Sequence, residues 1–206
     1  MEEEPEYKVI FLGNSGVGKT QLINSLLGNE FDSDSIVTTN AIFFSKYVEI
    51  NNKKYKINLW DTAGQEIYRA ITSLFVKGSS IVVFVYDITD DNSYNDLEFW
   101  IEKSQEILEN ESIYAIAGNK IDLFIDSKIT EETAKSLAKS KGFFFQQVSA
   151  KKDPKGVNDF IRMLLVKYID KYGEKKGEVN IKIENKSSKS RGCCSKSSSS
   201  KKKSKK

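Results

Sequence analysis

The segment GNSGVGKT (residues 13–20) decides how this sequence is interpreted. Three of its eight residues are glycine, and it ends in Lys19 and Thr20, which matches the pattern G-x-x-x-x-G-K-[ST]. A β-branched and aromatic run, YKVIFL (7–12), precedes it and predicts a buried strand. Helix-forming residues follow as far as Gly28, which is suited to end a helix. A strand, a glycine-rich loop and a helix are the context that this pattern requires.

The chemistry of this loop indicates that it holds a nucleoside triphosphate. Small residues allow successive backbone N–H groups to point at phosphate oxygens, and the helix N-terminus adds partial positive charge. Lys19 is placed to reach the β- and γ-phosphates, and the Thr20 hydroxyl to bind Mg²⁺. The nucleotide-binding residues predicted in this loop and at the start of the helix are Ser15, Gly16, Val17, Gly18, Lys19, Thr20 and Gln21.

A second motif, GNKIDL (118–123), indicates which base is bound. It follows a predicted strand at 113–117, and ligands of open α/β sheets bind at the carboxyl ends of strands. A carboxylate has two acceptor oxygens, so Asp122 can accept from both N1–H and the exocyclic amine of guanine. Adenine offers no such pair of donors. We therefore predict GTP rather than ATP, bound through Asn119, Lys120 and Asp122.

Two further motifs complete the predicted site. Ser149, Ala150 and Lys151 follow the next predicted strand and are placed to supply a backbone N–H to the guanine oxygen, although SAK alone fits a charged surface loop equally well. WDTAGQE (60–66) ends another strand, and its Asp61 is expected to hold Mg²⁺ through water. The Gly64 N–H can approach the γ-phosphate because no side chain intervenes. Gln65 is the predicted catalytic residue, because it can orient a water for in-line attack.

The remaining pattern predicts an α/β fold of the P-loop NTPase kind. Its sheet is mostly parallel and six-stranded, with one antiparallel edge strand and helices on both faces. The antiparallel strand comes from a hairpin with Asn51-Asn52 at its turn. Further strand-like and helical stretches alternate along the chain; the strands are 42–50, 55–60, 80–86, 113–117 and 143–148, and the helical patterns lie near 93–109, 131–140 and 156–171.

Charge divides the chain into a body and a tail. From Gly173 onward there are 12 Lys or Arg and 3 Asp or Glu, a net charge of +9, which leaves 20 basic and 26 acidic residues and a net charge of −6 before it. We predict an acidic extension at 1–6, a nucleotide-binding domain at 7–172 and a disordered tail at 173–206. The tail has no apolar period except the short VNIKI (179–183). Its charge favours an anionic membrane surface as partner, or serves only to keep a disordered end in solution.

Composition excludes several kinds of chemistry. The sequence has no histidine, which removes histidine general bases and histidine metal ligands. The two cysteines, Cys193 and Cys194, are adjacent, cannot form a disulfide framework and favour a reducing compartment. No apolar run approaches the roughly 18 residues that a membrane-spanning helix needs.

The four motifs, in this order and spacing, resemble the Ras superfamily of small GTPases over residues 6–172. Trp60 before DTAGQE, and VYDIT at 85–89, are most similar to the Rab branch. The resemblance implies that Phe31 packs against guanine and that Thr38 binds Mg²⁺ and senses the γ-phosphate. It also implies two switch segments, around 31–43 and 64–76, that order around the γ-phosphate and Mg²⁺.

Two features depart from the Rab pattern. In the run Thr38-Thr39-Asn40-Ala41-Ile42-Phe43, Asn40 replaces a glycine and Ile42 an acidic residue, which bears on the choice of effectors. Rab-like chains carry paired cysteines at or near the C-terminus, whereas twelve residues follow Cys194 here. Prenylation enzymes read the terminus, so Cys193 and Cys194 are candidate lipidation sites at which prenylation, S-acylation and unmodified thiols all stay open.

The resemblance implies a slow GTPase that binds GTP or GDP with Mg²⁺ and acts as a molecular switch in vesicle trafficking. Residues 31–40 contain no arginine, so we expect an activating protein to supply one. We also expect an exchange factor and effectors, a monomer on the cytosolic face of an internal membrane, and no nucleic-acid partner. Two alternatives are a constitutively GTP-bound scaffold, suggested by Asn40 and Ile42, and a P-loop nucleotide kinase or ATPase, which NKID disfavours.

Overall fold

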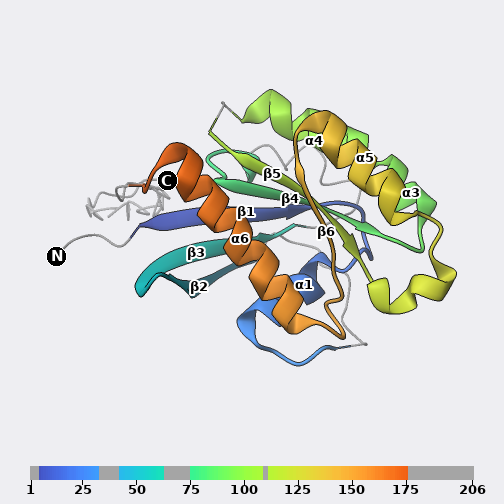
Figure 1. The fold of residues 1–206 in the computed structure, drawn as a ribbon, viewed down its shortest axis with the longest axis horizontal. Coiled ribbons are helices and arrows are strands. Elements are labelled where there is room, and N and C mark those ends of the chain that lie inside the picture. Colours follow the sequence, from blue (N-terminus) through green and yellow to red (C-terminus); the bar gives the residue numbers. More distant parts are fainter. Residues whose placement is uncertain (1–4, 33–41, 63–74, 109–110, 176–206) are drawn as a thin grey trace, which may run out of the picture.

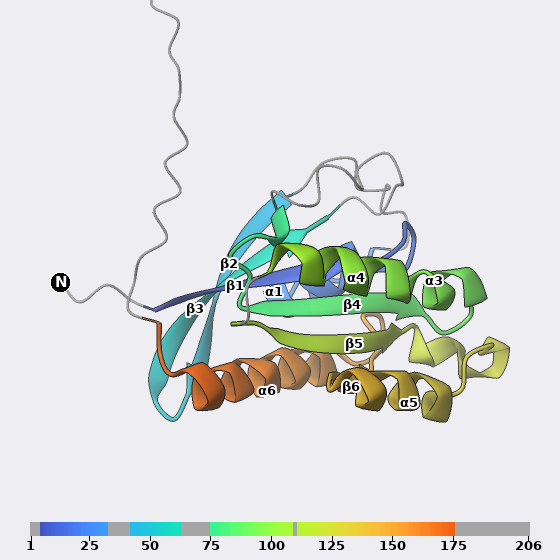
Figure 2. The same ribbon diagram turned by 90° about the horizontal axis from the view of Figure 1, so that it is seen from above.

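A mixed six-stranded sheet forms the centre of the molecule, with strand order β2-β3-β1-β4-β5-β6 (Figures 1 and 2). The structure is a computed structural model that describes residues 5–32, 42–62, 75–108 and 111–175. The strands are β1 (Glu6–Leu12), β2 (Ile42–Ile50), β3 (Lys53–Asp61), β4 (Ile81–Asp87), β5 (Ile113–Asn119) and β6 (Phe144–Gln147). The helices are α1 (Lys19–Leu27), α3 (Asp91–Asn95), α4 (Leu97–Ile107), the 3-10 helix η2 (Ile121–Asp126), α5 (Glu131–Lys141) and α6 (Pro154–Tyr172).

The antiparallel edge predicted from the Asn51-Asn52 turn is confirmed. β2 pairs with β3 in the antiparallel sense, whereas β1 pairs in parallel with both β3 and β4, and β5 with both β4 and β6. Asn51 and Asn52 have φ of 51° and 62°, which is the left-handed pair that a two-residue hairpin turn needs. The predicted fold class, a mostly parallel α/β sheet with one antiparallel edge strand, is therefore the fold that this chain has.

Helices cover both faces of the sheet, and alternating residues of each strand divide between the two cores. Along β1, Tyr7, Val9 and Phe11 contact the side of α1 and α6, while Ile10 and Leu12 contact the side of α3, α4 and α5. All seven residues of β4 are buried, as expected for a central strand with a helix layer on either side. This double covering explains why the sequence of β4 shows an unbroken apolar run and no alternation.

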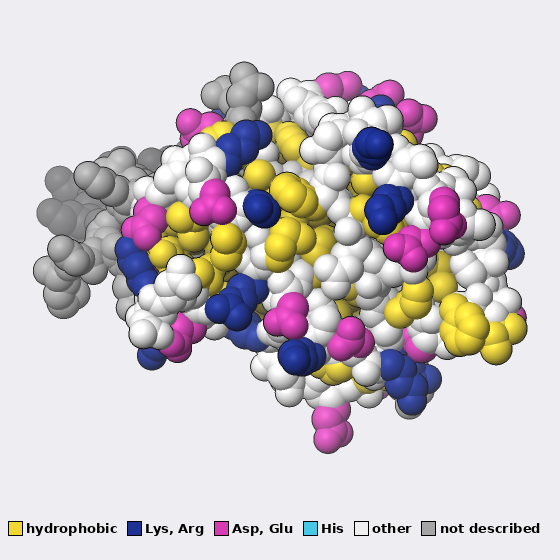
Figure 3. Space-filling view, in the orientation of Figure 1, with side chains coloured by type: hydrophobic (Ala, Val, Ile, Leu, Met, Phe, Trp, Pro, Cys, Tyr) yellow, Lys and Arg dark blue, Asp and Glu magenta, His cyan; other side chains and the backbone are white. Residues whose placement is uncertain are grey.

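Two sequence expectations need correction. The single helix expected near 93–109 is two helices, α3 and α4, separated at Asp96, whose side chain accepts a hydrogen bond from Asn14 in the glycine-rich loop. The helix η2 was not expected at all. It exposes three consecutive apolar side chains, Leu123, Phe124 and Ile125, and hydrophobic atoms are visible at the corresponding end of the molecule in Figure 3. With no apolar period along it, η2 carries no pattern from which a helix can be predicted.

The chain turns out of the last helix at Gly173, which has φ of 79°, and is described as far as Lys175. The greater part of the predicted tail, with Cys193 and Cys194, lies outside the described residues. Within the residues that the structure describes, no helix has the length and apolar character needed to cross a membrane.

The packing of α6 predicts a strong effect of core truncation. Leu164 is fully buried in the core between α6 and the sheet. We expect Leu164→Ala to lower the free energy of unfolding by about 2–5 kcal/mol, because the lost methyl groups leave a cavity. Arg162→Ala, on the exposed side of the same helix, should change it by no more than about 0.5 kcal/mol. Urea denaturation followed by circular dichroism measures both, and equal losses would contradict the burial of Leu164 against the sheet.

Candidate functional site

The predicted site residues that the structure describes gather at the carboxyl ends of the strands. The glycine-rich loop (13–18) follows β1, and Asp61 ends β3. Asn119 ends β5, and the segment 149–151 follows β6. Because β1, β3, β5 and β6 run in the same direction, segments that are more than a hundred residues apart meet at one edge of the sheet (Figure 1).

The glycine-rich loop depends on backbone conformations that glycine adopts without strain. Gly13, Gly16 and Gly18 have φ of 148°, 80° and 94°, a region costly for residues with a side chain. A Cβ on Gly13 would lie 2.1 Å from the carbonyl oxygen of Val85 in β4. The loop is therefore pressed against the central strand, and its first glycine is required for contact as well as for conformation.

Lys19 is buried beneath this loop. It is 5% exposed, and its Nζ donates to the carbonyl oxygens of Gly13 at 2.9 Å and Asn14 at 2.8 Å. Burial lowers the pKa of Lys19 to about 8, and the carboxylate of Asp61 opposes that shift. The N-cap residue of α1, Gly18, has no side chain to cap the helix. A buried ammonium group next to a helix N-terminus without a side-chain cap favours an anion.

Thr20 and Asp61, two predicted metal ligands, lie next to each other. The Thr20 hydroxyl donates to Asp61 Oδ2 at 2.7 Å, and Asp61 is fully buried. A hydroxyl and a carboxylate are hard oxygen donors that suit Mg²⁺, which is commonly held by one or two such groups together with phosphate oxygens and water. No cluster of three or more acidic, cysteine or histidine residues that could hold a metal occurs in the described parts of the chain. These two residues therefore fit a Mg²⁺ ion that shares its coordination with a bound phosphate.

Asn119 connects three loops that meet at the site. Its Nδ2 donates to the carbonyl oxygen of Val17 at 2.8 Å, and its Oδ1 accepts from the N–H of Ala150 at 3.3 Å. A Cβ on Gly18 would lie 2.4 Å from this same Nδ2. The glycine-rich loop, the NKID loop and the SAK segment are thus held in one arrangement by a single buried amide.

The other two predicted base-contacting residues are each fixed by a neighbour. Asp122 accepts a hydrogen bond from the Ser149 hydroxyl at 2.6 Å. Lys120 has φ of 67° at the start of η2, and its Nζ lies 2.6 Å from Asp87 Oδ2. The NKID and SAK motifs, identified separately in the sequence, therefore form one side of the same site.

Phe31 and Lys151 lie beside this region. Lys151 Nζ is 5.5 Å from the centre of the Phe31 ring, which is 41% exposed. Gln21 on α1 positions the segment that carries Phe31, because its side chain donates to the carbonyl oxygen of Asp32 at 2.9 Å and accepts from the Asp32 N–H at 3.3 Å. An aromatic face and a lysine stem are thereby available beside the loops that are predicted to contact the base.

Two residues of the site escaped sequence reasoning. Asn14 Oδ1 accepts from the Trp100 indole N–H at 3.0 Å, and Asn14 Nδ2 donates to Asp96 at 2.7 Å, so the loop is also held from α4. Nothing in the sequence points to that partner. Asp87, which pairs with Lys120, is a carboxylate at the end of a strand next to β5, and that position is a signal from which it could have been found.

The remaining predicted residues divide into two groups. Ser15 and Gly16 form the exposed turn of the glycine-rich loop, and Val17 is buried. Thr38, Gly64 and Gln65 lie outside the described residues, so their predicted roles stay predictions.

Comparisons with known proteins agree with this arrangement. The Ras family model matches residues 8–170. The chain is similar to Ras-related protein YPT3 from Nicotiana plumbaginifolia (33% identical, over 92% of this chain and 94% of the relative). It is also similar to Ras-related protein Rab11C from Nicotiana tabacum (35% identical, over 77% of this chain and 71% of the relative). A third relative is human Ras-related protein Rab-21 (35% identical, over 80% of this chain and 72% of the relative). The chain therefore belongs to the Ras family of small GTPases and is a Rab-like member of that superfamily.

Proposed function

We propose that this chain binds GTP and GDP across the glycine-rich loop and the NKID loop, and that it hydrolyses GTP slowly as a molecular switch. The observation that carries the proposal is the Asn119 to Val17 hydrogen bond of 2.8 Å. It joins a loop suited to phosphates to a loop suited to guanine. A ligand that spans both must carry a phosphate chain and a purine.

Selection of guanine rests on Asp122. Its carboxylate can accept from two neighbouring N–H groups of guanine, and adenine presents no such pair. The Ser149 hydroxyl, which donates to Asp122 Oδ1, fixes the orientation of that carboxylate. Phe31 and Lys151 provide apolar surface for the two faces of the base. Because Ser149 already orients the Asp122 side chain, that side chain loses less conformational entropy when a base binds.

The phosphate end of the proposed site combines charge and backbone donors. The Lys19 ammonium group and the N-terminus of α1 stabilise negative charge on the phosphates. Thr20, and Asp61 through a water, would hold Mg²⁺, which would neutralise part of the charge that develops during phosphoryl transfer. Gln65 orients the attacking water, and Thr38 and Gly64 respond to the γ-phosphate. No arginine is present in residues 31–40, so fast hydrolysis depends on an arginine from an activating protein.

The cellular role proposed is that of a Rab-like switch in vesicle trafficking, at the cytosolic face of an internal membrane. It acts as a monomer with an exchange factor, an activating protein and effectors. The basic tail contributes attraction to an anionic membrane of roughly 1 kcal/mol for each lysine or arginine near the surface. A constitutively GTP-bound scaffold is the competing function, because Asn40 and Ile42 alter the first switch segment.

Replacement of Lys19 provides the direct test of nucleotide binding. In the presence of Mg²⁺, titration with fluorescent nucleotides should show tight binding of GDP and GTP and no competition from ATP. Lys19→Ala should weaken GDP binding by at least about thirtyfold, since loss of one partner of a buried charge pair costs about 2–5 kcal/mol. Lys155→Ala, on the exposed side of α6, is the control and should bind normally. Equal affinity for guanine and adenine nucleotides would refute the proposed function.

Gly18 tests the connection between the two loops. Gly18→Ala places a Cβ against Asn119 Nδ2, so it should break the hydrogen bond to Val17 and weaken GDP binding by about 10- to 100-fold, or 1.4–2.7 kcal/mol. Gly28→Ala is a matched control, because Gly28 also has positive φ, 81°, with no atom within 4 Å of its added Cβ. It should lower stability by about 1 kcal/mol and leave affinity unchanged. Isothermal titration calorimetry measures the affinities, and a parallel loss in both variants would show that backbone strain alone is responsible.

Gln65 separates a switch from a permanent scaffold. Gln65→Leu should retain GTP binding and slow single-turnover hydrolysis by about tenfold or more, because leucine cannot orient a water. The measurement is phosphate release after Mg²⁺ is added to the GTP-loaded protein. If the unmodified chain releases no phosphate over many hours, the scaffold is the better description. If Gln65→Leu hydrolyses GTP at the normal rate, the role given to Gln65 is wrong.

A further inference from the structure

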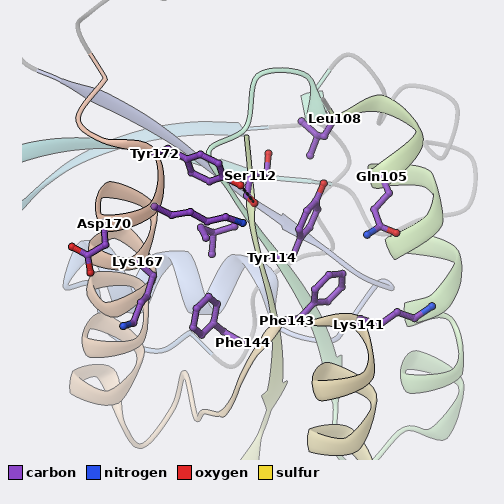
Figure 4. Close-up of a pocket in the computed structure, with 13 residues that line it drawn as sticks. Gln105, Leu108, Ser112, Tyr114, Lys141, Phe143, Phe144, Lys167, Asp170 and Tyr172 are labelled. Carbon is purple, nitrogen blue, oxygen red and sulfur yellow. Dashed lines mark hydrogen bonds between the residues drawn. The ribbon is translucent and has the colours of Figure 1, made fainter. Parts of the chain in front are cut away.

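A groove of about 630 Å³ opens at the amino ends of β5 and β6, at the opposite end of these strands from the proposed nucleotide site. Its floor is aromatic, with Tyr114, Phe143, Phe144 and Tyr172 around it (Figure 4). Phe143 and Tyr114 stack with ring centres 5.0 Å apart, and all four side chains are partly exposed. Part of this apolar surface is therefore left uncovered by the described residues.

The sheet itself creates this groove. β6 begins at Phe144, which pairs with Ala115, so Ile113 and Tyr114 of β5 extend beyond the start of the neighbouring strand. α5 ends at Lys141, and Gly142 turns the chain into β6. The space beside the first two residues of β5 therefore has no strand in it, and α4 and α6 form its walls (Figure 4).

The rim of the groove carries positive charge. Lys141, Lys167 and Lys171 line it, and Asp170 is the acidic residue among the lining side chains. The net charge of this set is +2. On the same face of the molecule, hydrophobic patches are bordered by Lys and Arg side chains (Figure 3). The groove thus suits an extended, apolar and weakly acidic segment.

A smaller hollow adjoins the groove near the point where the described chain ends. A second hollow of about 240 Å³ is lined by Lys175 and shares Leu108 and Ser112 with the first. Lys175 is fixed there, because its N–H donates to the Tyr7 hydroxyl at 3.2 Å and its Nζ to Ser80 Oγ at 2.9 Å. The chain therefore leaves Lys175 beside the hollow that adjoins the groove.

The sequence that follows Lys175 matches this surface. Residues 178–184 read EVNIKIE, in which Val179, Ile181 and Ile183 alternate with polar residues, a pattern typical of a strand with one apolar face. Its two glutamates and one lysine give a net charge of −1, opposite to that of the rim. Three residues from Lys175 to position 178 span at most about 10 Å, and seven extended residues span about 23 Å. Beyond Glu184 the tail has nine basic residues and no acidic one, which fits a cationic groove poorly.

We propose that residues 178–184 dock in this groove in an extended conformation. Val179, Ile181 and Ile183 face the aromatic floor, and Glu178 and Glu184 pair with the lysines of the rim. Attachment to the same chain favours this occupant over a separate acidic lipid, because a short linker gives an effective concentration in the millimolar range. Docking of this segment requires no nucleotide hydrolysis. As a consequence of docking, the basic tail starts from a fixed place at Glu184, and Cys193 lies nine residues further along the chain.

Disulfide trapping in the full chain tests the docking. The chain has only two cysteines, so Cys193→Ser with Cys194→Ser provides a background without thiols. Into it we would introduce Lys141→Cys on the rim with Ile183→Cys in the segment. This pair should form a disulfide under mild oxidation at least tenfold faster than Lys141→Cys with Ser199→Cys, which lies further along the same tail. Equal rates for the two pairs would overturn the proposal.

Two controls make this result specific. Ile125→Cys on η2, 83% exposed, paired with Ile183→Cys should form little disulfide, because η2 follows the carboxyl end of β5 and the groove lies at its amino end. GDP binding, measured on every variant, shows that the domain is folded, so a failure of docking is distinct from a failure of the proposed nucleotide site. Rapid trapping at Ile125 would mean that the segment does not select the groove, and would also overturn the proposal.

Backbone hydrogen exchange provides an independent measurement that leaves the side chains lining the groove unchanged. The triple variant Val179→Ser, Ile181→Ser, Ile183→Ser should exchange faster at 112–116 and 141–145, whereas Asn180→Ser with Lys182→Ser, on the polar face, should not. No difference between the triple variant and the unmodified chain would contradict docking. Protection that appears only with vesicles of phosphatidylcholine and phosphatidylserine, and persists in the triple variant, would assign the groove to lipid instead.

Discussion

The buried amide of Asn119 is the constraint on which the site depends. It donates to the backbone of the glycine-rich loop and accepts from the segment after β6, so it sets the distance between the loop suited to phosphates and the loop suited to a base. Such an amide is costly to bury unless both of its ends are bonded. Gly18 has to be glycine for the same reason, since a Cβ there would lie only 2.4 Å from the amide nitrogen. The glycine at position 18 and the position of the glycine-rich loop therefore both depend on the Asn119 amide.

Close to this amide, the structure places positive charge that can stabilise a bound anion. The Lys19 ammonium group is bonded to two carbonyl oxygens, and its pKa is lowered to about 8 because it is buried. Asp61, also buried, opposes that shift and bonds to Thr20. Positive charge, a helix N-terminus and hard oxygen ligands lie within one part of the molecule, which suits a phosphate with its metal ion. The Asn14 contacts to Asp96 and Trp100 fix the same loop from the side of α4.

The two ends of the parallel strands are suited to different tasks. At their carboxyl ends the loops contribute polar side chains to one site, whereas at their amino ends the early start of β5 relative to β6 leaves an aromatic groove with a cationic rim. α6 runs along the sheet and contributes to that groove near the place where the described chain ends (Figure 1). An occupant of the groove would therefore act on the tail rather than on the nucleotide. The length of the sheet would separate docking in the groove from nucleotide binding at the other end of the strands.

The sequence alone determined those features whose causes are local. Close neighbours in the sequence are enough to identify the glycine pattern with Lys19 and Thr20, the Asn51-Asn52 turn, the apolar periods of the strands and the carboxylate of Asp122. Four such local motifs also indicated the family. Only the tertiary structure decided which distant side chains meet. Trp100 reaches Asn14, Lys120 pairs with Asp87, and Asp96 separates α3 from α4 while it accepts from the loop. These partners are separated by up to 86 residues. No local pattern encodes such a pairing, because it results from the order in which the strands pack and from the burial of groups that then need a partner.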